Sequence, residues 1–328
     1  MIHIKSLLLF FVLPHIILFI QMKKYFLISV CLLFYTSAFC QLPTVSSGKI
    51  VRIDSLASKY ITARNIDIWL PSNYSANKKY AVLYMHDGQM LFDSNTTWNK
   101  QEWMVDETVA SLINQKVIKE CIVVGVWNGG KTRHIDYFPQ KPFESLVTTQ
   151  QAEIYSANRT NGNSVFNGGK VQSDLYLKFL VEELKPLIDS KFSTLKDRQH
   201  TFIAGSSMGG LISMYAICEY PDVFGGAACL STHWPGIFSV ENNPIPKAFY
   251  EYLRKHLPNP KYHKIYFDYG TATLDAMYPS LQKKVDEIMI SKGFSKKNWI
   301  TKEFIGANHS EKAWQKRLYI PITFLMNK

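Results

Sequence analysis

The stretch that decides the fold is Thr201-Phe-Ile-Ala-Gly-Ser-Ser-Met-Gly-Gly-Leu-Ile-Ser-Met-Tyr-Ala-Ile-Cys-Glu219. Its first four residues predict a short buried strand, and residues 211–219 carry apolar side chains at helical spacing. Between them, Gly205-Ser206-Ser207-Met208-Gly209 has the pattern of a nucleophile elbow, a sharp strand-to-helix turn with small flanking residues. The pattern also occurs in ordinary tight turns, but the strand before it and the helix after it favour the elbow. We therefore expect Ser207 to be an exposed, nucleophilic serine.

Outward from this stretch, short runs rich in Val, Ile, Tyr and Phe alternate with longer amphipathic runs, which is typical of strand–helix units around a mostly parallel sheet. We expect an α/β fold with a twisted central sheet and helices on both faces. The expected buried strands cover 80–85, 121–127, 201–204, 227–230 and 264–267, and a last strand covers 299–304. The expected helices cover 105–115, 171–190, 211–219, 247–256, 281–292 and 311–326. Residues 49–54 and 62–70 alternate apolar and polar side chains and predict an antiparallel edge hairpin.

The stretch 128–169 is polar and rich in glycine and asparagine, and it is longer than an ordinary connection between elements. It contains no clear helical or strand period. Two interpretations remain open: the stretch caps a site near Ser207, or it is a mobile insertion.

A serine hydroxyl needs a neighbouring base and an acidic residue that orients the base. In the α/β-hydrolase fold, where strand–elbow–helix units of this kind occur, the acid and then the histidine follow the serine in the chain, and the histidine lies between the last strand and the last helix. Of the four histidines after Ser207, only His309 has that position, so we expect it to be the base. His233 follows an expected strand and is a weaker candidate for the pocket wall, as are His256 and His263, which flank a Pro-rich turn.

The acidic residue is expected just after the strand at 264–267, where Asp268 and Asp275 compete. Asp275 lies in the loop beyond the carboxyl end of the strand, where side chains face the site. Asp268 still belongs to the strand. The sequence favours Asp275 and leaves Asp268 as the alternative.

A carbonyl under attack develops negative charge on its oxygen, which main-chain N–H groups stabilise. One donor is expected from Met208, directly after the serine. The second is expected from Gln89 in His86-Asp87-Gly88-Gln89, where Gly88 would let the chain turn. The alternative is an ordinary Asp-Gly turn.

With these residues in place, the chain resembles the Putative esterase family of the α/β-hydrolase superfamily, which includes esterase D, feruloyl esterases, enterochelin esterases and mycolyl transferases. The likeness covers nearly all of residues 60–328. Its carriers are Leu83-Tyr-Met-His-Asp-Gly-Gln89, Glu182-Glu-Leu-Lys-Pro186, the elbow, Asp268-Tyr-Gly-Thr271, and Gly306-Ala-Asn-His309 followed by Trp314. The resemblance implies Gln89, Asp275 and His309 as functional positions. One departure is the long spacing between Gly270 and Asp275, which keeps Asp268 in consideration.

The resemblance implies a serine carboxylic ester hydrolase that works through an acyl-enzyme without a cofactor, on acylated carbohydrate or siderophore-type esters. The alternatives are an acyltransferase on the same scaffold and a non-catalytic binding module, because fold alone does not define function. We expect Trp127, Trp234 and Arg133 to contact substrate, Arg133 by holding an anionic group. Trp103 and Trp314 are further aromatic candidates near the predicted mouth.

The first forty residues contain three lysines and no acidic residue, and they hold two apolar runs. They read as a signal peptide region that starts at Met22 and is cleaved after Cys40, which leaves 41–328 as a single α/β-hydrolase domain in the periplasm or secreted. A pair of short membrane helices and a lipid anchor on Cys40 are the alternatives. We expect no stable membrane insertion after removal of this region.

Removal of residues 1–40 lowers the formal net charge from +11 to +8. The positive charges are scattered, which argues against nucleic acid as a partner. Cys121, Cys218 and Cys229 remain, all in apolar runs, so we expect no disulfide framework. Apart from His256 and His263 on a Pro-rich loop, no histidine or cysteine pair has zinc-ligand spacing, so we expect no metal site. The sequence carries no signal for the oligomeric state.

Overall fold

The structure, a computed structural model, describes residues 41–159 and 161–327 of the chain. The predicted signal region, its start at Met22 and its cleavage after Cys40 lie outside the described residues. Residues 43–328 are grouped as one compact unit, and everything below concerns it. Within the part of the chain that is described, no helix has the length and hydropathy needed to cross a membrane.

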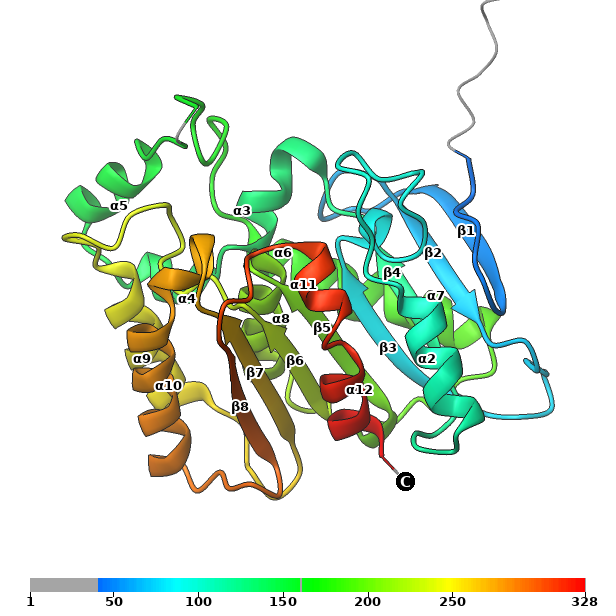
Figure 1. The fold of residues 1–328 in the computed structure, drawn as a ribbon. Helices are drawn as coiled ribbons and strands as arrows, with labels where there is room; N and C mark the ends of the chain where they lie inside the picture. The colour runs from blue at the N-terminus through cyan, green and yellow to red at the C-terminus, as the bar shows by residue number, and fades with distance from the viewer. Residues whose placement is uncertain (1–40, 160, 328) are drawn as a thin grey trace, which may run out of the picture. The chain divides into compact units, whose positions relative to one another are not determined.

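A single sheet of eight strands runs through this unit, in the order β1-β2-β4-β3-β5-β6-β7-β8 (Figure 1). The strands are β1 Lys49–Leu56, β2 Arg64–Leu70, β3 Ala81–His86, β4 Cys121–Val126, β5 Thr201–Ser206, β6 Gly226–Leu230, β7 Lys264–Gly270 and β8 Trp299–Phe304. β1 pairs antiparallel with β2, and β2 pairs antiparallel with β4, whereas the other neighbours are parallel. The predicted strands, the edge hairpin and the mostly parallel sheet are confirmed.

Helices lie on both faces of the sheet, as expected. The α-helices are α2 Val105–Asn114, α3 Arg133–Tyr137, α4 Gln140–Glu144, α5 Thr148–Tyr155, α6 Ser173–Lys178, α7 Lys185–Lys191, α8 Met208–Glu219, α9 Ile245–His256, α10 Pro279–Ser291, α11 Glu311–Gln315 and α12 Tyr319–Met326. A π-helical segment, η3 Phe179–Leu184, joins α6 to α7. Short 3₁₀ helices are η1 Gly88–Met90, η2 Gly130–Thr132, η4 Arg198–His200 and η5 Thr273–Met277.

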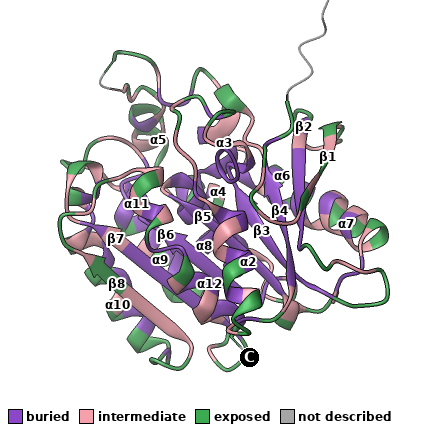
Figure 2. Ribbon diagram, turned by 45° about the vertical axis from the view of Figure 1, so that its right-hand side comes forward, coloured by how far each residue is buried: buried purple, intermediate pink, exposed green. Residues whose placement is uncertain are grey.

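Two apolar clusters fill the space between the sheet and these helices, and β3 shows how the strands divide between them. Val82 and Tyr84 belong to the cluster that includes α8, whereas Leu83 and Met85 belong to the cluster that includes α2 and α12. Successive side chains of a strand point to opposite faces, so a strand covered on both sides must be apolar throughout. Figure 2 shows the central strands buried along their length.

The predicted C-terminal helix at 311–326 is interrupted and forms α11 and α12. Pro321 explains the interruption, because it lacks the N–H that a continuous helix would bond to the carbonyl of Arg317. In the first turn of α12 the same proline costs no hydrogen bond.

The stretch 128–169 differs from the expected polar loop. It contains η2, α3, α4 and α5, and its apolar side chains Phe138, Phe143 and Phe166 are buried. Phe138 packs against Phe143 and Phe166 with ring centroids 5.5 and 5.6 Å apart, and against Phe249 of α9 at 5.8 Å. The stretch is therefore a packed part of the unit. Its aromatic residues lie at irregular intervals, so no helical period revealed their burial.

Among the described residues, Cys121, Cys218 and Cys229 are buried free thiols. Burial raises the pKa of the Cys121 thiol to about 12.

Candidate active site

Ser207 occupies a strained turn between β5 and α8. Its backbone angles are φ 56° and ψ −121°, a region that non-glycine residues rarely adopt. A Cβ added to Gly205 would lie 2.7 Å from the carbonyl group of Gly209, so the two glycines permit the close approach that the turn requires. The serine directly precedes α8, where free main-chain N–H groups and the helix dipole favour negative charge.

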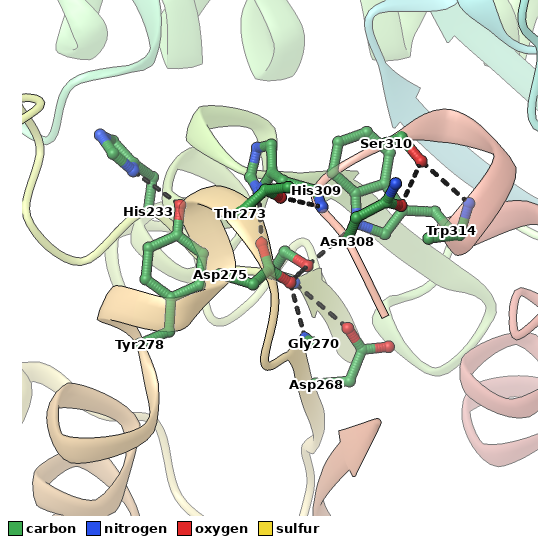
Figure 3. A network of polar contacts seen from close by, with 12 residues as sticks. His233, Asp268, Gly270, Thr273, Asp275, Tyr278, Asn308, His309, Ser310 and Trp314 are labelled. Carbon is green, nitrogen blue, oxygen red and sulfur yellow. Dashed lines mark hydrogen bonds and ion pairs between the residues drawn. The ribbon is translucent and has the colours of Figure 1, made fainter. Parts of the chain in front are cut away.

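His309 lies on the loop between β8 and α11, and Asp275 lies in η5 after β7. The Nδ1 atom of His309 is 2.5 Å from Oδ1 of Asp275, as Figure 3 shows. The histidine loop is also held by its main chain, since His309 donates its N–H to the Thr273 hydroxyl at 2.9 Å. Gly270 lets the two loops meet, because an added Cβ there would lie 2.1 Å from the Ala307 carbonyl oxygen.

The Asp275 carboxylate is buried and its other oxygen is fully engaged. Oδ2 accepts hydrogen bonds from the Ser231 hydroxyl and from the Gly270 main-chain N–H, each at 2.6 Å. Burial alone would raise the pKa of Asp275, but His309, Ser231 and Gly270 more than offset it and hold the pKa below its ordinary value. Asp275 is therefore a carboxylate that orients the His309 ring.

Asp268, the alternative that the sequence left open, has different partners. Its carboxylate accepts hydrogen bonds from Arg317 at 2.8 Å and from Tyr266 at 3.0 Å, and Ser231 donates its main-chain N–H at 3.2 Å. Burial raises the pKa of Asp268 to about 6, although Arg317 acts in the opposite direction. The geometry thus pairs Asp275, not Asp268, with the imidazole.

Ser207 and His309 line one cavity of about 460 Å³. The cavity lies at the carboxyl ends of the parallel strands, the usual place for ligands in sheets of this type. Its full lining consists of Asp87, Gln89, Met90, Trp98, Asn99, Gln101, Trp103, Asn128, Arg133, Ser206, Ser207, His309, Ser310, Glu311 and Trp314.

The turn after β3 places Gln89 in the lining, and Met208 is the first residue of α8. Gly88, however, is not the residue that turns the chain as expected. Asp87 has the left-handed conformation, with φ 57° and ψ 45°. Gly88 is needed for a different reason, since an added Cβ would lie 2.5 Å from the backbone of Gly125 in β4.

Arg133 lines the cavity, but its charge is already paired. Its guanidinium donates to both carboxylate oxygens of Asp87, at 2.6 and 2.7 Å, and Asn128 donates to the same carboxylate at 2.7 Å. Burial would raise the pKa of Asp87, but Arg133 and Asn128 outweigh it and hold the pKa below its ordinary value. Arg133 therefore has a structural role at the turn, and its contact with an anionic substrate group stays a prediction.

Trp127 and Trp234, both expected to contact substrate, lie away from the cavity lining. Trp127 donates to Asp67 at 2.7 Å and stacks under Arg52 at the edge of the sheet. Trp234 is fully buried and donates to Gln282 at 2.8 Å. Both tryptophans were selected because they lie near expected loops, and that position alone does not tell whether an indole is packed or exposed.

Trp103 and Trp314 do line the cavity, with ring centroids 5.4 Å apart. Trp98, which the sequence analysis did not single out, also lines it and is 83% exposed. It lies in a polar loop without periodicity, which is why no pattern pointed to it.

His233, the weaker pocket candidate, is buried, and its Nδ1 is hydrogen-bonded to the Tyr278 hydroxyl at 2.8 Å, as Figure 3 shows. Burial, with smaller contributions from His309 and Arg133, lowers the pKa of His233 to about 3. The ring is therefore neutral at physiological pH. Over residues 41–159 and 161–327, no three His, Cys, Asp or Glu side chains gather as a metal site would require.

A family model described as Putative esterase matches residues 59–321. Among curated relatives, the Uncharacterized protein YbbA of Bacillus subtilis (strain 168) is 23% identical over 182 residues, which are 55% of this chain and 61% of that protein. The match covers about three fifths of the length of that relative and a smaller share of the other curated relatives.

Two solved structures illustrate the likeness of fold. The ferulic acid esterase AmCE1/Fae1A from Anaeromyces mucronatus, in complex with ferulic acid, has a TM-score of 0.57 and 20% identity over 86% of this chain and 92% of that chain. The enterobactin esterase FES from Shigella flexneri also has a TM-score of 0.57, with 15% identity over 86% of this chain and 60% of that chain. At these identities the likeness shows that both structures share the overall fold of this chain.

Proposed function

Since this chain belongs to the Putative esterase family, we propose that it is a serine carboxylic ester hydrolase with Ser207 as nucleophile, His309 as base and Asp275 as the orienting acid. The observation that carries the proposal is the meeting of three distant segments. A strained serine and a histidine line one cavity, and a buried carboxylate holds that histidine by its Nδ1 atom.

The reaction follows from these positions. The Ser207 hydroxyl attacks the ester carbonyl carbon while its proton passes to Nε2 of His309, whose Nδ1–H remains bonded to Asp275. The tetrahedral intermediate collapses, the carbon–oxygen bond to the alcohol breaks, and the imidazolium protonates the departing alcohol. Water then attacks the acyl-enzyme in the same way, and the carboxylic acid is released with Ser207 restored.

Main-chain N–H groups of Gln89 and Met208 are proposed to bind the oxyanion. Met208 begins α8 directly after Ser207, and Gln89 lies in η1, two residues after the left-handed Asp87 and in the cavity lining. Fixed donors stabilise developing charge without a cost of reorientation during the reaction.

Acylated carbohydrate or siderophore-type esters are the proposed substrates. The exposed Trp98 offers a flat apolar face at the cavity, and the neighbouring Asn99 and Gln101 offer hydrogen bonds. Such a combination suits a sugar ring or an aromatic acyl group. The ferulate-bound and enterobactin esterase neighbours support the same two classes.

The test is hydrolysis of a short nitrophenyl ester, followed by a panel of feruloylated sugars, acetylated sugars and a tricatecholate ester. Ser207→Ala should abolish turnover and labelling by a fluorophosphonate probe. Ser190→Ala, which removes an exposed serine hydroxyl on α7 outside the cavity lining, should retain both. Undiminished turnover in Ser207→Ala would refute the assignment, and acyl transfer to an added sugar in place of acid release would identify an acyltransferase.

We also propose that the protein acts in the periplasm or outside the cell. The first forty residues support this, because they are apolar, contain lysines and lack acidic residues. Amino-terminal sequencing of the protein recovered from separated cell fractions tests it. The expected result is an exported chain that begins at Gln41.

A further inference from the structure

Ser231 directly follows β6 and is fully buried between the two carboxylates that competed in the sequence. Its backbone has φ 41°, in the left-handed region that disfavours non-glycine residues. Its main-chain N–H donates to Asp268, and its hydroxyl contacts Asp275. Ser231, in a strained left-handed conformation, is thus hydrogen-bonded to both Asp268 and Asp275.

The direction of each hydrogen bond at this hydroxyl follows from the chemistry of its neighbours. The Trp314 indole N–H and the Arg317 guanidinium each approach the Ser231 oxygen at 2.9 Å, and both groups can only donate. They occupy the two acceptor positions of the oxygen. The single hydroxyl proton is therefore committed to Oδ2 of Asp275, which is 2.6 Å away.

A second buried ion pair lies behind this hydroxyl. Arg317 is 3% exposed and its Nη2 atom donates both to Ser231 and, at 2.8 Å, to Asp268. The cation, the hydroxyl and Asp275 form a continuous chain of hydrogen bonds. Because bonds to charged groups are stronger than neutral ones, this chain fixes the carboxylate plane more firmly than the Gly270 amide could alone.

We propose that Ser231 is a positioning residue of the site, which holds Asp275 with Oδ1 toward His309 and relays the support of Arg317 and Trp314 to it. This inference rests on the proposed ester hydrolysis at Ser207. Without the hydroxyl, Asp275 loses one of two donors to Oδ2. The carboxylate is then held less firmly in the plane that suits His309, and its less neutralised charge interacts more strongly with protonated imidazole.

The test compares Ser231→Ala and Ser231→Gly with the wild type. Both remove the hydroxyl, and glycine also relieves the left-handed backbone, so at least one variant is expected to fold. We expect kcat to fall about tenfold or more with KM within about twofold. The acid limb of the kcat/KM profile should move to higher pH. The matched control is Thr201→Val, which removes a buried hydroxyl at the opposite end of the sheet and should alter neither quantity.

A proton NMR measurement gives a readout that does not depend on turnover. The short His309–Asp275 hydrogen bond should give a far-downfield Nδ1–H resonance in the wild type, and loss of Ser231 should shift or broaden it. If the wild type hydrolyses no ester, the proposed function fails while the resonance still tests the role of Ser231. If folded Ser231 variants keep wild-type kcat, pH profile and resonance, the inference is overturned.

Discussion

Both carboxylate oxygens of Asp87 are bound by the guanidinium of Arg133, at 2.6 and 2.7 Å, across 46 residues of chain. This pair joins the helical stretch after β4 to the turn that is proposed to bind the oxyanion. The stretch 128–169 is therefore fixed to the site at its first turn. Its earlier interpretation as a freely mobile insertion does not fit this contact.

Loss of Arg133 should impair both stability and activity. In Arg133→Met the mostly buried Asp87 carboxylate loses its counter-charge, and since the Arg133 side chain is 30% exposed, we expect a cost of about 2 kcal/mol in unfolding free energy. We expect kcat to fall because the oxyanion turn loosens. Urea denaturation and steady-state kinetics measure the two effects. The exposed Lys131→Met is the control, and a double variant with Asp87→Asn should recover part of the stability; equal stability of Arg133→Met and wild type would contradict the role.

Gly270→Ala should separate His309 from Asp275. The new Cβ would lie 2.1 Å from the Ala307 carbonyl oxygen, so the histidine loop must move. Misplacement of a catalytic group by about 1 Å costs about 100-fold in rate, and we expect a loss of that order in kcat/KM. Gly306→Ala is the matched control in the same loop, because its φ of 76° brings backbone strain but no atom lies within 4 Å of the added Cβ. Similar losses in both variants would mean that any disturbance of this loop lowers activity and that the contact with Ala307 is not decisive.

Trp98→Ala should change substrate affinity without affecting the fold. The indole is 83% exposed, so its removal should leave the melting temperature unchanged, whereas KM for a feruloylated or acetylated sugar should rise several-fold. Turnover of nitrophenyl acetate should stay constant, because that ester is too small to need the platform. Tyr319→Ala removes another exposed aromatic side chain and serves as the control. An unchanged KM for every large ester would exclude the platform.

Acid should destabilise the protein through two buried histidines. Burial lowers the pKa of His86 and of His233 to about 3, from an ordinary value of 6.5. Between these values the unfolded chain binds protons that the folded chain does not, so the unfolding free energy falls as pH drops from 6.5 toward 3. Each histidine contributes a slope of up to about 1.4 kcal/mol per pH unit.

Urea unfolding at several pH values between 4 and 7.5 measures this slope. The single variants His86→Gln and His233→Gln should each reduce it, and the reduction should be confined to the window below pH 6.5. If neither variant alters the slope, other groups govern the acid response.

The sheet could be predicted from the sequence because its central strands are covered on both faces. Val82 to Met85 must then be apolar without a break, and such runs are visible without any structure. The elbow could also be predicted from the sequence, because the close contact that requires Gly205 and Gly209 joins residues only four positions apart. Contacts between such near neighbours can be recognised as a short sequence motif.

Features that depend on distant contacts were predicted less well. The choice between Asp268 and Asp275 depends on Arg317, Ser231 and His309, which come from three other segments. Trp234 was expected to contact substrate because it lies near a loop at the predicted mouth. Its packing depends on Gln282, which is 48 residues away and gives no local signal. The burial of Phe138 likewise depends on Phe249 of α9, and no periodicity within 128–169 indicates it.

The three buried thiols have a practical consequence. Alkylating reagents attack the thiolate, and burial keeps these groups protonated and inaccessible, so modification must wait for the fold to open. Cys121 belongs to the apolar cluster of α2 and α12, whereas Cys218 and Cys229 belong to that of α8. Mass spectrometry can therefore follow the order in which the three cysteines are alkylated. That order would identify which of the two apolar clusters opens first, without an engineered reporter residue.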